Sequence, residues 1–161
     1  MPQRLELVLD CLRTLRDRFS LPVLVSTHPR TKVRLENLRS SDLEGINFHE
    51  PFGYLDYNKL QMNAFCVVSD SGTISEESAI IGFPAVSIRD SIERPEALET
   101  GSIILTGLNP TNLAQSVELV RTQSLTSSMP QGYEILDFSN RVLRFLFSTA
   151  RLNQSWDNLH G

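Results

Sequence analysis

The stretch "SDSGTISEES", residues Ser69 to Ser78, decides how the fold is predicted. It follows the apolar run "AFCVV" and precedes "AIIGFPAVSIRD". An apolar strand therefore ends in a small polar turn, Asp70-Ser71-Gly72-Thr73, and a helix with two adjacent glutamates begins directly after it. Gly82 is expected to end this helix, since glycine is common just beyond a last helical turn. The stretch predicts one strand–turn–helix unit.

The same alternation of strand and helix extends along the whole chain. Helices are expected at 3–18, 31–39, 56–64, 74–81, 94–100, 109–123 and 140–152. Apolar strands are expected at 23–26, 45–51, 65–69, 84–88 and 102–107. Because these strands are continuous apolar runs, the pattern is typical of a parallel sheet covered by helices on both faces. The predicted fold class is α/β, a three-layer, parallel-sheet Rossmann-like domain.

Composition and charge limit the function classes. The chain has 161 residues, is 40% hydrophobic and carries a formal charge of -4, which suits one globular core and not a nucleic-acid-binding surface. It contains neither a signal peptide nor an apolar run long enough to cross a bilayer, so we expect a cytoplasmic protein. Cys11 and Cys66 are expected to be buried free thiols. The predicted domain covers 1–150, with a tail at 151–161 and a flexible link at 124–132.

Four polar loops follow the predicted strands: "THPR", "EPFGYLDY", "SDSGTISEE" and "RDSIERPE". In open parallel sheets, ligands bind beyond the carboxyl ends of the strands. The loops are therefore expected to meet at one ligand-binding edge.

The turn at Ser71 and Gly72 has the pattern of an anion site. The first amides of a helix lack partners within the helix and carry partial positive charge, and glycine lets a phosphate approach the backbone. Thr73 and Glu76 fit a capping box, so Glu76 is expected to close the helix. The cap does not require Glu77. A carboxylate close to a phosphate is electrostatically unfavourable unless it accepts hydrogen bonds from neutral hydroxyls, and a ribose offers two of these. Together these features predict a nucleoside diphosphate site.

Other loop residues have a functional and a structural interpretation. Arg89 and Arg94 could face the same anion, although a single arginine after a strand is often a surface ion pair. His28 follows the first strand at the expected ligand edge. Tyr57 could stack on a base or could belong to the core.

With these residues placed, the chain resembles the C-terminal half of the non-hydrolysing UDP-N-acetylglucosamine 2-epimerases. The resemblance lies in "VLVSTHPRT", "FGYLDYNKLQMNAFCVVSDSGTISEES", "GFPAVSIRDSIERPEALETGS" and "SNRVLRF", which cover nearly the whole chain. It implies the C-terminal domain of a two-domain enzyme of the GT-B type, with the active site between the domains. It implies a UDP-sugar substrate, a homodimer in the full-length form, and no metal or redox cofactor.

The resemblance also implies residue roles. Ser71, Gly72 and Thr73 would contact the diphosphate, and Arg94 would bind phosphate. Glu77 would accept the ribose hydroxyls, and Tyr57 would lie near the uracil. His28 matches the family's catalytic histidine beside the departing diphosphate.

The family reaction inverts C2 of an amino sugar. The C2 proton is removed while UDP leaves C1, which gives a glycal intermediate. UDP then adds back to C1 while C2 is protonated on the other face, and the product supplies precursors of cell-surface polysaccharides. Thr73 stands where the glucosamine enzymes usually have glycine. In this respect the sequence is more similar to a branch of the family that acts on a UDP-2-acetamido-2,6-dideoxyhexose. The resemblance implies that the proton-transfer carboxylates belong to an N-terminal domain, which we expect to be missing from this chain. We therefore expect this chain, as a fragment or one part of a split enzyme, to bind UDP weakly and not to epimerise.

Two other functions fit the same domain. It could be the nucleotide half of a GT-B glycosyltransferase, or a stand-alone UDP-sugar-binding module. The module would bind its ligand tightly without a second domain. Exposed apolar side chains at Phe145, Leu146 and Phe147 would instead favour a half-enzyme that requires a partner surface.

Overall fold

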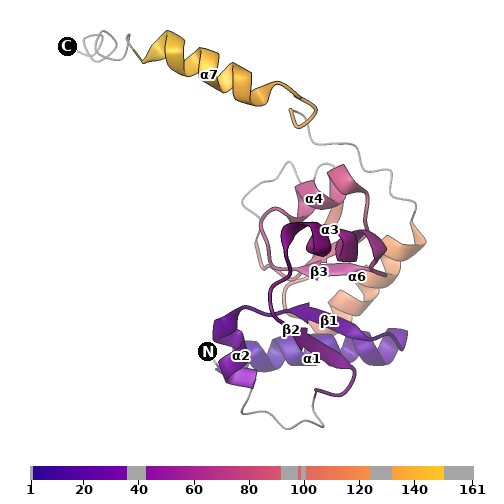
Figure 1. The fold of residues 1–161 in the computed structure, drawn as a ribbon. Coiled ribbons are helices and arrows are strands. Elements are labelled where there is room, and N and C mark those ends of the chain that lie inside the picture. Colours follow the sequence, from indigo (N-terminus) through magenta and orange to yellow (C-terminus); the bar gives the residue numbers. More distant parts are fainter. Residues whose placement is uncertain (1, 36–42, 92–97, 99–100, 124–131, 151–161) are drawn as a thin grey trace, which may run out of the picture. The chain divides into compact units, whose positions relative to one another are not determined.

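A computed structural model describes residues 2–35, 43–91, 98, 101–123 and 132–150. The chain has two compact units, Met1–Met129 and Pro130–Gly161 (Figure 1). Each is described by itself, and the predicted domain boundary at 150 stays a prediction.

The order of strands and helices follows the alternation predicted from the sequence. The elements of the first unit are α1 (Pro2–Phe19), β1 (Val23–Ser26), α2 (Pro29–Leu35), β2 (Ile46–His49), α3 (Tyr54–Asn63), β3 (Val67–Ser69), α4 (Ile74–Ile81), β4 (Ala85–Ser87), β5 (Ile103–Leu105) and α6 (Pro110–Thr122). The second unit contains α7 (Phe138–Thr149). The helix predicted at 94–100 and the link at 124–132 lie largely outside the described residues.

The strands form two parallel ladders. β1 pairs with β2, with Val23 opposite Ile46. β4 lies between β3 and β5, with Ala85 opposite both Val67 and Ile103. The prediction of an α/β fold with parallel strands is confirmed, although the described residues show two ladders where one sheet was expected.

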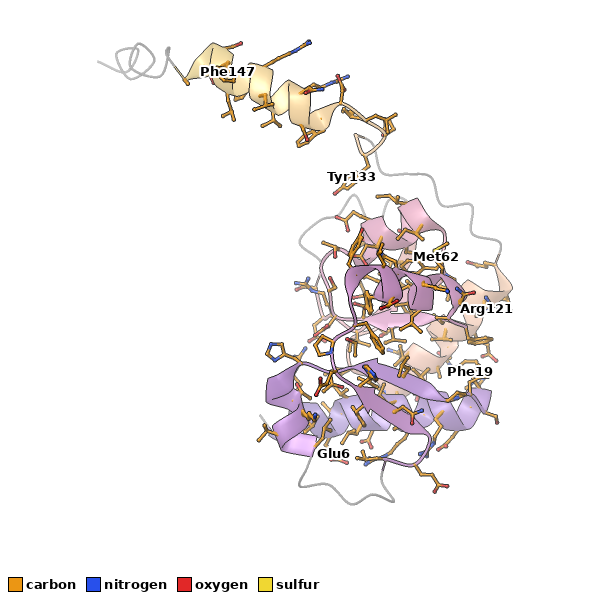
Figure 2. The ribbon with its side chains drawn as sticks, viewed as in Figure 1. Glu6, Phe19, Met62, Arg121, Tyr133 and Phe147 are labelled. Carbon is orange, nitrogen blue, oxygen red and sulfur yellow. The ribbon has the colours of Figure 1, made fainter. Side chains whose placement is uncertain are left out.

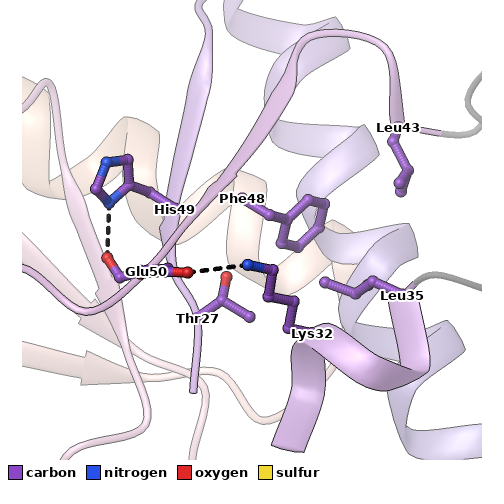
Figure 3. A pocket seen from close by; sticks show the side chains of 7 residues that line it. All are labelled: Thr27, Lys32, Leu35, Leu43, Phe48, His49 and Glu50. Carbon is purple, nitrogen blue, oxygen red and sulfur yellow. Dashed lines mark hydrogen bonds and ion pairs between the residues drawn. The ribbon is translucent and has the colours of Figure 1, made fainter. Parts of the chain in front are cut away.

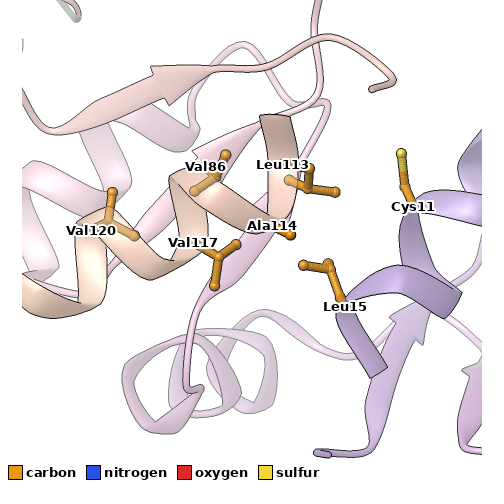
Figure 4. Close-up of a cluster of buried hydrophobic side chains, with 7 residues drawn as sticks. All are labelled: Cys11, Leu15, Val86, Leu113, Ala114, Val117 and Val120. Carbon is orange, nitrogen blue, oxygen red and sulfur yellow. The ribbon is translucent and has the colours of Figure 1, made fainter. Parts of the chain in front are cut away.

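Helices cover both faces of the three-stranded sheet. On one face α6 lies against β4, and α1 packs against α6 (Figure 4). The buried side chains of this layer are Cys11, Leu15, Val86, Leu113, Ala114, Val117 and Val120. On the other face α4 closes a second cluster made of Val67, Ile74, Phe83, Ala85 and Ile103. The three-layer arrangement is therefore present around β3, β4 and β5.

The β1–β2 pair departs from the prediction. Burial alternates along β1, and Leu24 is 48% exposed, whereas every residue of β4 is buried. α1 contacts β1 and β2, but Leu24 points to the opposite face of the strand from its neighbours Val23 and Val25. The prediction that all strands are buried on both faces is wrong for this pair.

Both cysteines are free thiols, as predicted. Cys11 is buried in the α1–α6 layer, and Cys66, directly before β3, is partly buried. Burial raises the pKa of the Cys66 thiol to about 12. Next to it, the Phe65 ring lies 5.3 Å from the Phe19 ring and 4.7 Å from the Arg121 guanidinium carbon. Figure 2 labels the Phe19 and Arg121 side chains. These contacts fix the end of α1 against the end of α6.

The helix ends are set by local signals. Asn109 is the N-cap of α6 and accepts a hydrogen bond from the Asn112 N–H at 3.0 Å, with Pro110 at the first helical position. Gly82 ends α4 with φ +84°, a left-handed conformation that glycine adopts without strain. The predicted C-terminal glycine of this helix is confirmed.

In the second unit, α7 has no buried residue. Its exposed side chains include Phe145, Leu146 and Phe147, the last of them 82% exposed. The three apolar side chains named in the sequence analysis are thus exposed on this helix within the second unit. No helix of the described residues combines the length and the apolar character that a membrane crossing requires.

Candidate functional site

The turn between β3 and α4 is open to solvent. Asp70, Ser71, Gly72 and Thr73 are all exposed, at the carboxyl end of β3. The sequence analysis expected the turn amides to have no hydrogen-bond partner, but two of them have one. The Ser71 N–H donates to the Ser69 hydroxyl at 3.0 Å, and the Thr73 N–H donates to the Ser71 hydroxyl at 3.3 Å. An anion at this turn would compete with serine hydroxyls for these two amides.

The two glutamates of α4 have different environments. Glu76 is 6% exposed, and its Oε2 accepts a hydrogen bond from the Ser75 hydroxyl at 2.7 Å. Glu77 is only partly buried, and its Oε1 accepts from the Thr73 hydroxyl at 2.7 Å. Thr73 makes no side-chain cap bond to the helix. The predicted capping box is wrong, because the Thr73 hydroxyl is used by Glu77.

Helix α3 supplies two further neighbours of Glu77. The Nε2 of Gln61 donates to its Oε2 at 3.2 Å. Tyr57, one helical turn earlier, has its pKa raised by burial first and then by the Glu77 and Asp70 carboxylates. Burial and the two neighbouring carboxylates thus both raise the pKa of Tyr57 and favour its neutral phenol. Gln61 was not singled out from the sequence, although its i+4 spacing from Tyr57 places both on one face of α3.

The backbone at Gly72 lies against a cation. A Cβ built on Gly72 would stand 2.9 Å from the Nη1 of Arg89, which follows β4. The loops after β3 and β4 thus meet at one edge, as predicted from parallel pairing. The sequence offers Arg89 as a possible anion ligand, and its Nη1 lies close to the glycine of the turn.

The described contacts do not test the roles of two further predicted site residues, His28 and Arg94. His28 is exposed at the end of β1, and its carbonyl accepts from the Thr31 and Lys32 amides in the first turn of α2. Arg94 lies outside the described residues. The roles expected for both stay predictions.

A pocket of about 260 Å³ lies elsewhere, between α2 and β2 (Figure 3). Its lining residues are Thr27, Lys32, Leu35, Leu43, Phe48, His49 and Glu50. The Lys32 ammonium and the Glu50 carboxylate form an ion pair across it at 2.9 Å. None of the residues predicted for the nucleotide site lines this pocket.

The cluster at the β3–α4 turn has parts suited to an anionic ligand with hydroxyl groups. The helix start and Arg89 favour negative charge, while Glu77 accepts hydrogen bonds from neutral donors. The described residues include no group of three or more His, Cys, Asp or Glu side chains placed to hold a metal ion. The helix start, Arg89 and Glu77 could bind an anion that carries hydroxyl groups.

The chain is similar to known proteins over most of its length. The family model "UDP-N-acetylglucosamine 2-epimerase" matches residues 1–146. The UDP-N-acetylglucosamine 2-epimerase of Methanocaldococcus jannaschii is 33% identical over 134 residues, which are 81% of this chain and 37% of that protein. The chain thus spans well under half the length of this relative.

Solved structures agree. The UDP-N-acetylglucosamine 2-epimerase of Rickettsia bellii matches with a TM-score of 0.85 and 37% identity over 93% of this chain and 43% of that one. The Methanocaldococcus jannaschii enzyme, solved in complex with UDP-GlcNAc and UDP, matches with a TM-score of 0.81 and 32% identity over 92% of this chain and 41% of that one. The chain described here therefore belongs to the UDP-N-acetylglucosamine 2-epimerase family.

Proposed function

We propose that this chain is the UDP-binding half of a UDP-hexosamine 2-epimerase. The observation that carries the proposal is the Glu77 carboxylate, held by Thr73 beside the open turn on which Arg89 lies. In this arrangement Gly72 and Ser71 receive the diphosphate, and Glu77 accepts the ribose hydroxyls. Tyr57 lies beside Glu77 and would contact the nucleoside.

The contribution to the reaction is electrostatic. When the bond from the sugar C1 to UDP breaks, negative charge builds on the diphosphate. The start of α4 and the Arg89 guanidinium would stabilise that charge. His28 and Arg94 are proposed to act on the same diphosphate, and the carboxylates that move the C2 proton would come from a second domain.

Family membership favours an isomerase over the glycosyltransferase alternative. Two solved relatives have ligands of this class bound: the Methanocaldococcus jannaschii enzyme is in complex with UDP-GlcNAc and UDP, and the Neisseria meningitidis enzyme is bound to UDP-GlcNAc. We propose the same ligand class for this chain, either UDP-N-acetylglucosamine or a UDP-2-acetamido-2,6-dideoxyhexose. A cytoplasmic location would match the supply of such nucleotide sugars.

Titration of the isotope-labelled chain with UDP tests the proposal. We expect the amide signals of Ser71, Gly72 and Thr73 to shift together and saturate at a weak affinity. Uridine should shift them far less, because it lacks the diphosphate. The chain alone should convert no UDP-N-acetylglucosamine. Unmoved turn signals at saturating UDP would contradict the binding site, and clear turnover by this chain alone would contradict the half-enzyme assignment.

Replacing Gly72 by alanine should weaken UDP binding about tenfold, the loss of one good hydrogen-bonded contact. The new Cβ would lie 2.9 Å from Arg89 Nη1, so the guanidinium must shift and the diphosphate loses its close approach to the backbone. The far end of an arginine moves easily, so the free energy of unfolding should change by less than about 1 kcal/mol. Calorimetric titration with UDP and with uridine measures the effect. An unchanged UDP affinity would remove Gly72 from the site.

A further inference from the structure

The carboxylate of Glu77 is held at both oxygens without any ligand. Thr73 donates to Oε1 at 2.7 Å, and Gln61 donates to Oε2 at 3.2 Å. The two donors belong to different parts of the fold, the start of α4 and the middle of α3. A glutamate side chain has several rotatable bonds, and these two contacts restrict them before a ligand arrives.

The number of remaining acceptor positions matches a diol. An ionised carboxylate offers about four lone-pair positions, two on each oxygen. One position on each oxygen is used by Thr73 or Gln61. One position on each oxygen is therefore left for an incoming hydroxyl, and the vicinal 2′ and 3′ hydroxyls of a ribose present two.

Gln61 is an unusual residue to bury in this short helix. It is 3% exposed, and no partner exists within the described residues for its Oε1. An apolar side chain of the same length would fill this space without leaving a buried polar atom unsatisfied. The hydrogen bond to Glu77 accounts for the amide at this position.

Thr73 controls the direction of a chain of hydroxyl groups. A carboxylate can only accept, so the Thr73 proton is donated to Glu77. The Ser71 and Thr73 hydroxyls lie 3.0 Å apart, and the donor between them must then be Ser71. Removing the Thr73 hydroxyl would free the Ser71 hydroxyl to donate to a phosphate. The same change would remove one of the two hydrogen bonds that hold the Glu77 carboxylate.

We propose that Thr73 and Gln61 are positioning residues that set the Glu77 carboxylate for the two ribose hydroxyls. The inference rests on the proposed function, since it assigns the ribose to Glu77. The preference of the site for ribose would then depend on the Thr73 hydroxyl and the Gln61 amide, although neither group needs to contact the ligand. This positioning also gives a role to threonine at position 73, where a glycine could not supply the hydroxyl.

The experiment compares UDP, 2′-deoxy-UDP and inorganic pyrophosphate binding to the unaltered chain, Thr73→Val and Gln61→Met. In both variants we expect the ratio of UDP to 2′-deoxy-UDP affinity to fall by about three- to tenfold, because a charge-assisted hydrogen bond orients the carboxylate. Pyrophosphate affinity should stay the same or rise in Thr73→Val. Gln61→Met should be at least as resistant to urea as the unaltered chain, since the unpartnered oxygen is gone. Thr73→Ser keeps the hydroxyl and should restore the ratio.

The outcomes separate the two proposals. If the unaltered chain prefers UDP and both variants keep that preference in full, the positioning roles are wrong and the proposed function stands. If the unaltered chain binds UDP and 2′-deoxy-UDP equally, the ribose contact of Glu77 is wrong and this inference falls with it. If pyrophosphate and UDP affinity fall by the same factor in Thr73→Val, Thr73 acts on the phosphates and not through Glu77.

Discussion

Replacing Phe83 by alanine should lower the free energy of unfolding by about 3–5 kcal/mol, the range for removing a buried aromatic ring. Phe83 is 1% exposed and packs with Val67, Ile74 and Ile103 between α4 and the sheet. A single domain is stable by only about 5–15 kcal/mol, so this one change removes a large share. Urea denaturation followed by circular dichroism measures the loss.

Phe147→Ala is the matched control, because the same ring is 82% exposed on α7. Its effect on the free energy of unfolding should stay within about 0.5 kcal/mol. If Phe83→Ala does not fold, Phe83→Leu should give a smaller and measurable loss, since leucine retains much of the apolar volume. A loss below about 1 kcal/mol for Phe83→Ala would mean that the ring is not part of the core.

The fold could be predicted largely because its signals are local. Helix α4 begins and ends where "ISEESAII" and Gly82 predict, and α6 begins after an asparagine and a proline. The exposure of Leu24 could not be predicted, because it depends on which faces of a sheet other elements cover. A run of four apolar or small residues is compatible with a strand buried on both faces and with a strand buried on only one, so the sequence pattern does not distinguish them.

The candidate site was predictable in its position and less so in its contacts. Parallel pairing brings the loops after β3 and β4 to one edge, so the approach of Arg89 to Gly72 follows from topology. Thr73 has glutamates at both i+3 and i+4, and spacing alone favoured a cap with Glu76. Burial decides otherwise, since Glu76 turns into the protein and Glu77 remains near the turn. Gln61 meets Glu77 only through the packing of α3 beside α4, which no local pattern contains.

Replacing Glu77 by glutamine should weaken UDP binding about ten- to hundredfold, because hydrogen bonds to a charged group contribute about 1.5–3 kcal/mol. The amide keeps the shape of the carboxylate but carries no charge and has a single acceptor oxygen. The fold should persist. Gln61 can turn its amide so that its Oε1, which has no partner in the described part of the chain, accepts from the new side chain. Pyrophosphate affinity should not fall, since the ribose contact is absent and a negative charge near the phosphates is removed.

Calorimetric titration with UDP and pyrophosphate measures this, and Glu118→Gln is the matched control. Glu118 is an exposed carboxylate on α6 that pairs with Arg18 at 2.7 Å, so its loss removes the same charge at a place remote from the turn. A surface pair of this kind contributes about 0–1 kcal/mol, and UDP affinity should stay within about twofold. Equal losses of UDP and pyrophosphate affinity in Glu77→Gln would place Glu77 at the phosphates. Unchanged UDP affinity in Glu77→Gln would show that Glu77 does not contact the nucleotide. An amide of the same shape has no other interaction that could replace two lost charge-assisted hydrogen bonds.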